Sequence, residues 1–145
     1  MKPLHSALAL ALLSMPALGH PHDISQGTAV QLGGATVTLV YEHPIPGMPG
    51  KSLKGVVVDY EPGGASPSHT HAPSAIIYAT VIEGAVHCQL NNGPVRTYRA
   101  GENWTEMPGD HHNISANASQ TERARVLAVF VVDTNDLELT RPDRR

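Results

Sequence analysis

The chain has 145 residues, with 10 lysines and arginines against 13 aspartates and glutamates, for a formal net charge of −3. This length fits one domain, and a mildly acidic chain without a basic stripe argues against nucleic acid or an anionic membrane surface as the partner. The single cysteine, Cys88, excludes an internal disulfide, so the domain must be held together by its hydrophobic core.

Residues 1–19 have the pattern of a cleavable export signal. A lysine near the start is followed by a short apolar run at residues 7–13 and by a small-x-small cleavage site, Ala-Leu-Gly, at residues 17–19. The run is too short to span a bilayer, so no membrane anchor is expected after cleavage. We therefore predict one domain over residues 20–145, periplasmic or secreted, with its core over about residues 30–133.

Short runs rich in Val, Ile, Thr and Tyr follow one another along the rest of the chain. Glycines and prolines punctuate these runs, and no segment after the signal keeps a helical period for three turns. Such a pattern is typical of an all-β sandwich or closed barrel. The predicted strands cover residues 35–42, 55–60, 75–82, 85–90, 95–98, 103–106, 113–116 and 123–132.

Several segments between these strands indicate turns or loops. Glu83-Gly84 predicts a tight hairpin, and Asn91-Asn92-Gly93 is a type I′ or bulged hairpin signal. Residues 43–50 contain three prolines, which remove ladder donors, so we expect a loop there, one that could lie over a barrel mouth. The polar tail from Asp133 onward is expected to leave the barrel or to pair with a neighbouring subunit.

Histidine spacing is the strongest chemical signal in the chain. His69 and His71 follow a turn rich in Gly, Pro and Ser, and two histidines two positions apart on an extended segment project to the same side. Of the later pair, His111 and His112, only one should join them, because neighbours on a strand face opposite sides. Neutral imidazole is a common ligand of divalent first-row metals, so the pattern predicts a metal centre.

Two motifs around these histidines resemble the two motifs of the cupin superfamily, over roughly residues 53–132. The matching positions are Gly63, His69, His71 and Gly84 in the first motif, and Gly101, Gly109 and His112 in the second. Three positions depart: Ile77 stands where the first motif has glutamate, Met107 replaces a proline, and the final asparagine is displaced to Asn117. The chain resembles a small single-domain cupin, which implies an all-β, double-stranded β-helix or jelly-roll barrel.

The resemblance implies a metal site formed by His69, His71 and His112. Register with the second motif selects His112, which leaves His111 as a supporting donor or proton carrier at the rim. Glu106 is the carboxylate nearest to the second motif. It could supply the oxygen ligand that the first motif lacks, act as a base, or point into solvent.

Tyr78 is a further candidate, because it lies on the strand that follows the first histidine pair. Its hydroxyl could donate a hydrogen bond to a substrate, or the side chain could simply pack with the hydroxyl at the rim. Cys88 lies in a strand-like run, and we expect it to be a buried small hydrophobe rather than a reactive thiol.

Three imidazoles, with or without Glu106, leave open coordination positions on Fe, Mn, Zn, Ni or Cu; ligand type alone does not select among these metals. With Fe the resemblance implies dioxygenase chemistry on a small organic molecule, and with the other ions isomerase or lyase chemistry. The alternative is a non-catalytic cupin that binds a small ligand or senses a metal. A homodimer is expected from the resemblance, and it would also cover edge strands.

Overall fold

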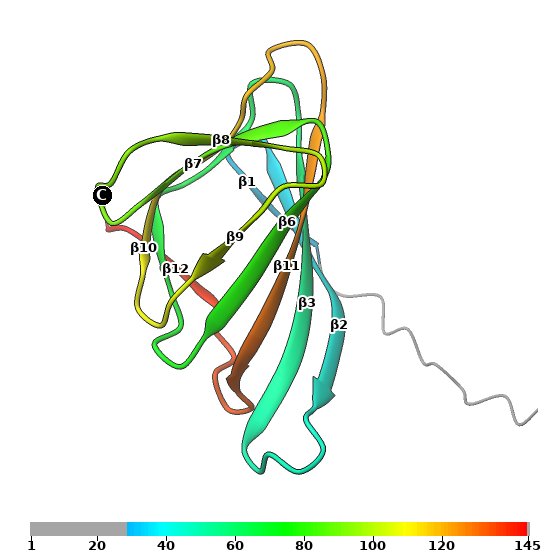
Figure 1. Ribbon diagram of the computed structural model, residues 1–145, viewed down its shortest axis with the longest axis vertical. Coiled ribbons are helices and arrows are strands. Elements are labelled where there is room, and N and C mark those ends of the chain that lie inside the picture. The colour runs from blue at the N-terminus through cyan, green and yellow to red at the C-terminus, as the bar shows by residue number, and fades with distance from the viewer. Residues whose placement is uncertain (1–28, 145) are drawn as a thin grey trace, which may run out of the picture.

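The computed structural model describes residues 29–144, and the predicted signal peptide lies outside the described residues. Within this range the chain forms twelve strands (Figure 1), and none of it is a helix long and apolar enough to cross a bilayer. The strands are β1 (Ala29–Leu32), β2 (Ala35–Pro44), β3 (Lys51–Tyr60), β4 (Ala65–Ser66), β5 (His69–His71), β6 (Ile76–Glu83), β7 (Ala85–Leu90), β8 (Arg96–Arg99), β9 (Asn103–Glu106), β10 (His111–Asn117), β11 (Ala124–Asp133) and β12 (Thr140–Pro142).

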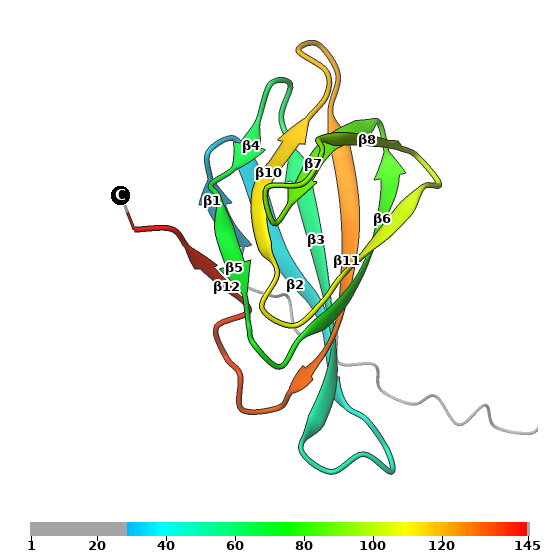
Figure 2. The same ribbon diagram turned by 60° about the vertical axis from the view of Figure 1, so that its left-hand side comes forward.

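The strands form two antiparallel sheets that face each other. The long-strand sheet has the order β1-β2-β3-β11-β6-β9, and the short-strand sheet has the order β12-β5-β10-β7-β8, with β4 also paired to β10. Figure 2 shows the two sheets enclosing a common interior. From β3 onward the chain passes back and forth between the two sheets. All the described elements are strands, so the all-β fold expected from the sequence is confirmed.

The centre of the long-strand sheet, where β11 pairs with β3, follows a regular alternation of side chains. β11 pairs with β3 over ten consecutive positions, and on β11 the buried residues Val126, Phe130 and Val132 point to the interior. A strand's side chains alternate between faces, so the β-branched residues between them form the outer surface. Cys88, on β7, lies in the core between the sheets as expected, and burial raises the pKa of its thiol to about 12.

The predicted hairpin at Asn91-Asn92-Gly93 is confirmed, since β7 pairs with β8, but the turn at Glu83-Gly84 is not a hairpin: β6 and β7 lie in different sheets and do not pair. Asn91 and Asn92 have φ values of 51° and 58°, the left-handed conformation that the first and second turn positions of a type I′ turn require. Gly84, with φ of 71°, connects β6 to β7 beside the backbone of β11. A Cβ at this position would lie 2.4 Å from the carbonyl oxygen of Arg123, so only glycine fits there.

Two expectations about the ends and loops need correction, and one strand was missed. Residues 45–50 do form the β2–β3 turn, but they do not line the pocket described below; the hairpin projects away from β5 and β12 (Figure 2). The tail does not leave the barrel: after a turn that follows β11, β12 pairs with β5 of the same chain. β1 pairs with β2 through four residues and was not predicted, because a four-residue run carries too little alternation.

Candidate metal centre

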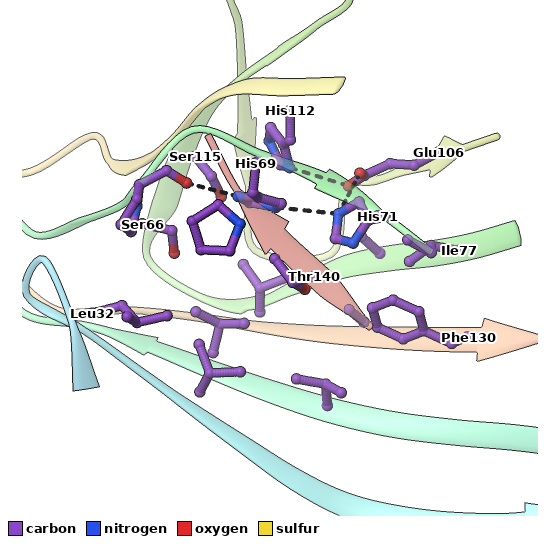
Figure 3. A pocket seen from close by; sticks show the side chains of 18 of the residues that line it. Leu32, Ser66, His69, His71, Ile77, Glu106, His112, Ser115, Phe130 and Thr140 are labelled. Carbon is purple, nitrogen blue, oxygen red and sulfur yellow. Dashed lines mark hydrogen bonds and ion pairs between the residues drawn. The ribbon is translucent and has the colours of Figure 1, made fainter. Parts of the chain in front are cut away.

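Three buried histidines meet where β5 pairs with β10. The antiparallel register places His69 directly opposite His112, and His71 lies two residues further along β5 on the same side. The exposed fractions of His69, His71 and His112 are 7%, 7% and 4%. One ligand nitrogen from each ring lies within 4.8 Å of the others, and Figure 3 shows the rings converging. The structure therefore brings together the three histidines selected by motif spacing.

Backbone carbonyls orient two of the rings. His69 Nδ1 lies 2.7 Å from the carbonyl oxygen of Pro67, and His71 Nδ1 lies 3.2 Å from that of Leu139. A carbonyl oxygen only accepts, so each Nδ1 donates its proton and leaves Nε2 with a free lone pair when the ring is neutral. The two Nε2 atoms are 3.2 Å apart. Two lone pairs at this separation require a proton or a cation between them.

Burial favours the neutral, ligand form of the rings. It lowers the pKa of His69 from 6.5 to about 4, since the hydrogen bond to Pro67 opposes the shift only in part and the neighbouring imidazoles add to it. Burial also lowers the pKa of His112, although the carboxylate of Glu106 opposes that change. At neutral pH both rings are therefore uncharged and able to bind a metal.

Glu106 approaches the histidines from β9, whereas the glutamate of the first cupin motif would approach them from β6. In the pairing of β6 with β9, Glu106 lies directly opposite Ile77, the position where the first cupin motif has its glutamate. Its Oε2 lies 2.9 Å from His71 Nε2, and its Oε1 lies 3.4 Å from His112 Nδ1. The side chain is 3% exposed, so of the three roles left open by the sequence, pointing into solvent is excluded.

The carboxylate of Glu106 is ionised. Burial by itself would raise its pKa, but the contact with His71, the nearby His112 ring and a hydrogen bond from Trp104 outweigh that cost and lower the pKa to about 2. Trp104 Nε1 donates to Oε1 at 2.9 Å, which fixes the orientation of the carboxylate. An ionised carboxylate beside the three imidazoles offers one oxygen ligand together with three nitrogen ligands.

Two buried polar atoms at this point have no hydrogen-bond partner: Glu106 Oε2 and His112 Nε2. With the proton of His71 on Nδ1, the 2.9 Å approach of Oε2 to His71 Nε2 brings two lone pairs together, which requires a proton or a cation between them. Buried polar atoms without partners cost about 1–3 kcal/mol each. Both face the histidine cluster, so a bound cation would satisfy them, and the residues present fit a divalent first-row metal.

The cluster forms one side of a pocket between the two sheets. The pocket has a volume of roughly 100 Å³, and the inner face of the long-strand sheet supplies its apolar wall. The residues of that wall are Val37, Val56, Val58, Ile77, Ala79, Val126, Ala128 and Phe130. Thr140 and Pro142 of β12 also line the pocket. The sequence suggested that this segment leaves the barrel, but it forms part of the site.

Two residues that the sequence suggested for the site, Tyr78 and His111, lie outside the pocket. Ile77 points into the pocket, so Tyr78, the next residue on β6, points outward; it is 48% exposed and does not line the pocket. His111 also lies outside: its Nε2 is 2.9 Å from Asp143 and 3.1 Å from Ser68. That ring fastens the C-terminal segment to the start of β5 rather than supporting His112.

Sequence reasoning missed three hydroxyl groups of the pocket. Tyr60, Ser66 and Ser115 all line it, and they come from β3, β4 and β10. No motif marks them. The one available signal was the alternation of the run at residues 55–60, which places Tyr60 on the same side as Val56 and Val58.

Comparison with known proteins agrees with this geometry. The chain is 40% identical over 65 residues to germin-like protein 8-1 of Oryza sativa subsp. japonica, and the match covers 45% of this chain and 29% of that protein. The chain thus spans less than a third of that relative's length.

Solved structures share the fold. An uncharacterized conserved protein with a double-stranded beta-helix domain from Klebsiella pneumoniae matches with a TM-score of 0.59 and 25% identity, over 72% of this chain and 83% of that one. A recombinant oxalate oxidase in complex with glycolate matches with a TM-score of 0.56 and 24% identity, over 83% of this chain and 62% of that one. An oxalate decarboxylase variant of B. subtilis matches with a TM-score of 0.62 and 20% identity, over 83% of this chain and 31% of that one.

The match to a family model shows which family the chain belongs to. The model of the cupin domain matches residues 56–130, which is more than half of the chain and includes all three histidines and Glu106. The chain therefore belongs to the cupin family.

Proposed function

We propose that this protein is an exported, metal-dependent enzyme that acts on a small organic molecule. His69, His71 and His112 hold the metal, and Glu106 is its fourth protein ligand. The observation that carries the proposal is the convergence of three imidazoles and one ionised carboxylate, two of their atoms unsatisfied, inside a pocket with apolar walls.

The ligand set suits Fe, Mn, Zn, Ni or Cu. A metal held there supplies Lewis-acid activation and, if it is redox-active, electron transfer to dioxygen, which supports dioxygenase or isomerase and lyase chemistry. The chain's own residues orient and isolate the substrate: Trp104 holds the carboxylate of Glu106, and Ile77 and Phe130 keep water from the reacting face.

Glu106 has a second task that its contacts support. An ionised carboxylate 2.9 Å from an imidazole can accept a proton from a substrate that reaches the cluster, and the low pKa means that it does so only transiently. The same pKa excludes Glu106 as a resident proton donor at neutral pH.

The test combines metal analysis with a reaction. The mature protein is purified, its metal content is measured, and oxygen consumption is followed with Fe(II) and a small enol such as acetylacetone. We expect about one metal per chain and enol-dependent oxygen uptake or enol conversion, both lost in His69→Ala. His87→Ala is the matched control, since His87 bonds Thr97 away from the pocket.

Each outcome of this test has a definite meaning. Equal metal content in the wild type and in His69→Ala would reject the metal centre. Stoichiometric metal with no turnover on any enol, carbonyl or thiol probe would favour the alternative, a cupin that binds a small ligand or senses a metal without catalysis.

We further propose a homodimer formed through the outer face of the long-strand sheet. Across β2, β3, β11 and β6 the register aligns Tyr41, Gly55, Val129 and Tyr78 in one row. Tyr41 and Tyr78 are 52% and 48% exposed, and Ile76 beside them is 41% exposed. Exposed apolar side chains gathered on one face are typical of a surface that contacts another protein. Light scattering should give twice the chain mass for the wild type and a lower mass for Tyr41→Lys.

Export and domain limits are proposed from the N-terminal pattern. Removal of residues 1–19 would leave a single domain over residues 20–145. N-terminal sequencing of the protein recovered outside the cytoplasm should begin at His20, and an intact Met1 would contradict the proposal.

A further inference from the structure

The pocket has a second polar end, away from the histidines. Tyr60, which is 3% exposed, places its hydroxyl 2.6 Å from Ser115 Oγ and 3.4 Å from Ser66 Oγ. All three residues line the pocket. In Figure 3, Ser66 and Ser115 lie on the side of His69 opposite to His71 and Glu106. We name Tyr60, Ser66 and Ser115 the hydroxyl cluster.

A β-bulge aims the hydroxyl cluster and the histidines into the same space. The pairing of β10 with β7 shifts between His112 and Ile114, which makes Asn113 an extra residue. Residues three apart on a regular strand face opposite sides, but the extra residue turns Ser115 to the side of His112. Ser66 pairs with Ser115 just as His69 pairs with His112. The two polar ends are thus about 10 Å apart along the strands.

Between these ends the pocket carries no positive side chain. Among the described residues that line it there is no lysine or arginine, and Glu106 is the one carboxylate. A second anionic group on a substrate would be buried against Val, Ile, Ala and Phe without a counter-charge, which is strongly unfavourable. A sugar would leave several hydroxyls without partners for the same reason.

The size of the pocket sets a further limit. Its volume is roughly 100 Å³. A cavity of about 150 Å³ holds a molecule of the size of benzene, with six heavy atoms, so by proportion this pocket admits a substrate body of about four heavy atoms next to the metal.

Building on the proposed metal centre, we infer that the pocket selects a small, mostly apolar molecule that binds the metal at one end and presents a single uncharged oxygen to the hydroxyl cluster. Tyr60 is the residue that determines this specificity. Burial, partly opposed by the serine hydrogen bonds, raises its pKa, so its hydroxyl stays protonated and can donate to a carbonyl or accept from a hydroxyl.

Three hydroxamic acids test the inference without turnover. Butanohydroxamic acid has an apolar end, 4-hydroxybutanohydroxamic acid adds one hydroxyl, and succinic acid monohydroxamate ends in a carboxylate. All three carry the same metal-binding head. Their dissociation constants are measured on the cobalt-loaded mature protein from the visible ligand-field bands.

In the wild type the hydroxyl probe should bind about 3- to 10-fold more tightly than the apolar probe, the worth of one neutral hydrogen bond. The carboxylate probe should bind more weakly than both. Tyr60→Phe should remove the preference for the hydroxyl probe without weakening the apolar probe, and Ser115→Ala should reduce it. Tyr41→Phe, a tyrosine outside the pocket, should leave it unchanged.

Two kinds of failure are distinguishable. A chain that takes up no cobalt overturns the metal centre, and with it the inference. A chain that binds cobalt but shows equal affinities, prefers the carboxylate probe, or keeps its preference in Tyr60→Phe overturns the inference alone.

Discussion

The two sheets of this protein differ in the length of their strands, and they contribute different groups to the pocket. The long-strand sheet pairs β3 with β11 over ten positions without a break and supplies the apolar wall of the pocket, although its register shifts where β11 pairs with β6 and where β2 pairs with β3. The short-strand sheet contains strands of two or three residues and the bulge at Asn113. Yet it supplies all three histidines and both serines of the pocket.

This contrast follows from what each sheet must do. Uninterrupted alternation buries the most apolar surface and suits a supporting wall. Regular alternation brings His69 and His71, two positions apart, to the same pocket, whereas His112 and Ser115, three positions apart, share it only because of the bulge between them. The long-strand sheet thus provides the apolar wall together with Glu106 and Tyr60, and the short-strand sheet provides the histidines and the serines.

The largest effect should come from a cavity in the long-strand sheet. Phe130 is 2% exposed and packs in the core, so Phe130→Ala should lower the free energy of unfolding by about 3–5 kcal/mol. Urea unfolding measures the loss. Leu90→Ala on β7, where the side chain is only partly buried, should cost less. An equal or larger loss at Leu90 would contradict this expectation.

The histidines should make the metal-free protein sensitive to acid. The pKa of His69 is about 4 in the folded state and 6.5 when the ring is in water, as in the unfolded chain. As the pH falls, the unfolded chain therefore binds a proton before the folded chain does. Stability is therefore full above pH 6.5 and is lost as the pH falls towards 4, by about 3 kcal/mol for this group. Thermal melts of the metal-free protein between pH 8 and pH 4 measure the slope. His69→Gln should flatten it, and an unchanged slope would reject this assignment.

Removal of the C-terminal strand should weaken the metal site with a smaller effect on the fold. Deleting residues 139–145 removes the carbonyl that orients His71. Loss of such a supporting hydrogen bond lowers metal affinity by about 10- to 100-fold. Competition with a chelator gives the affinity, and circular dichroism checks the fold. Arg141→Ala keeps the backbone of β12 and should bind metal like the wild type; wild-type affinity in the deletion would contradict the role of Leu139.

The smallest effect should come from Tyr78. Because it points outward from β6, Tyr78→Phe should change neither metal content nor activity, and stability should change by less than about 0.5 kcal/mol. Activity and metal content of this variant are compared with those of Tyr60→Phe. A loss of activity in Tyr78→Phe larger than that in Tyr60→Phe would reverse the assignment of the two tyrosines.

Much of the fold and the histidine cluster could be predicted because their signals are local. The predicted runs at residues 85–90 and 103–106 coincide with β7 and β9, and motif spacing selected His112 over His111. The strands depend on alternation over short separations, which a single sequence displays, and the choice of His112 depended on the resemblance to the second cupin motif.

The rest depends on which strands become neighbours. Glu106 could be assigned to the interior only through its pairing with Ile77, and that register joins segments almost thirty residues apart. The short strand β12 has no apolar pattern, so its return to β5 could not be foreseen. Tyr60 and Tyr78 both lie in predicted strands. Sequence alone does not say which face of a strand becomes the inside, so Tyr78 was considered as a site residue and Tyr60 was overlooked.

The hydrogen bond between His71 and Leu139 spans 68 residues of sequence. During synthesis the histidine pair leaves the ribosome long before the carbonyl that fixes its second ring. The geometry needed to retain an ion therefore arises only when β12 pairs with β5. Retention of a metal is in this way tied to the docking of a segment that lies far along the chain.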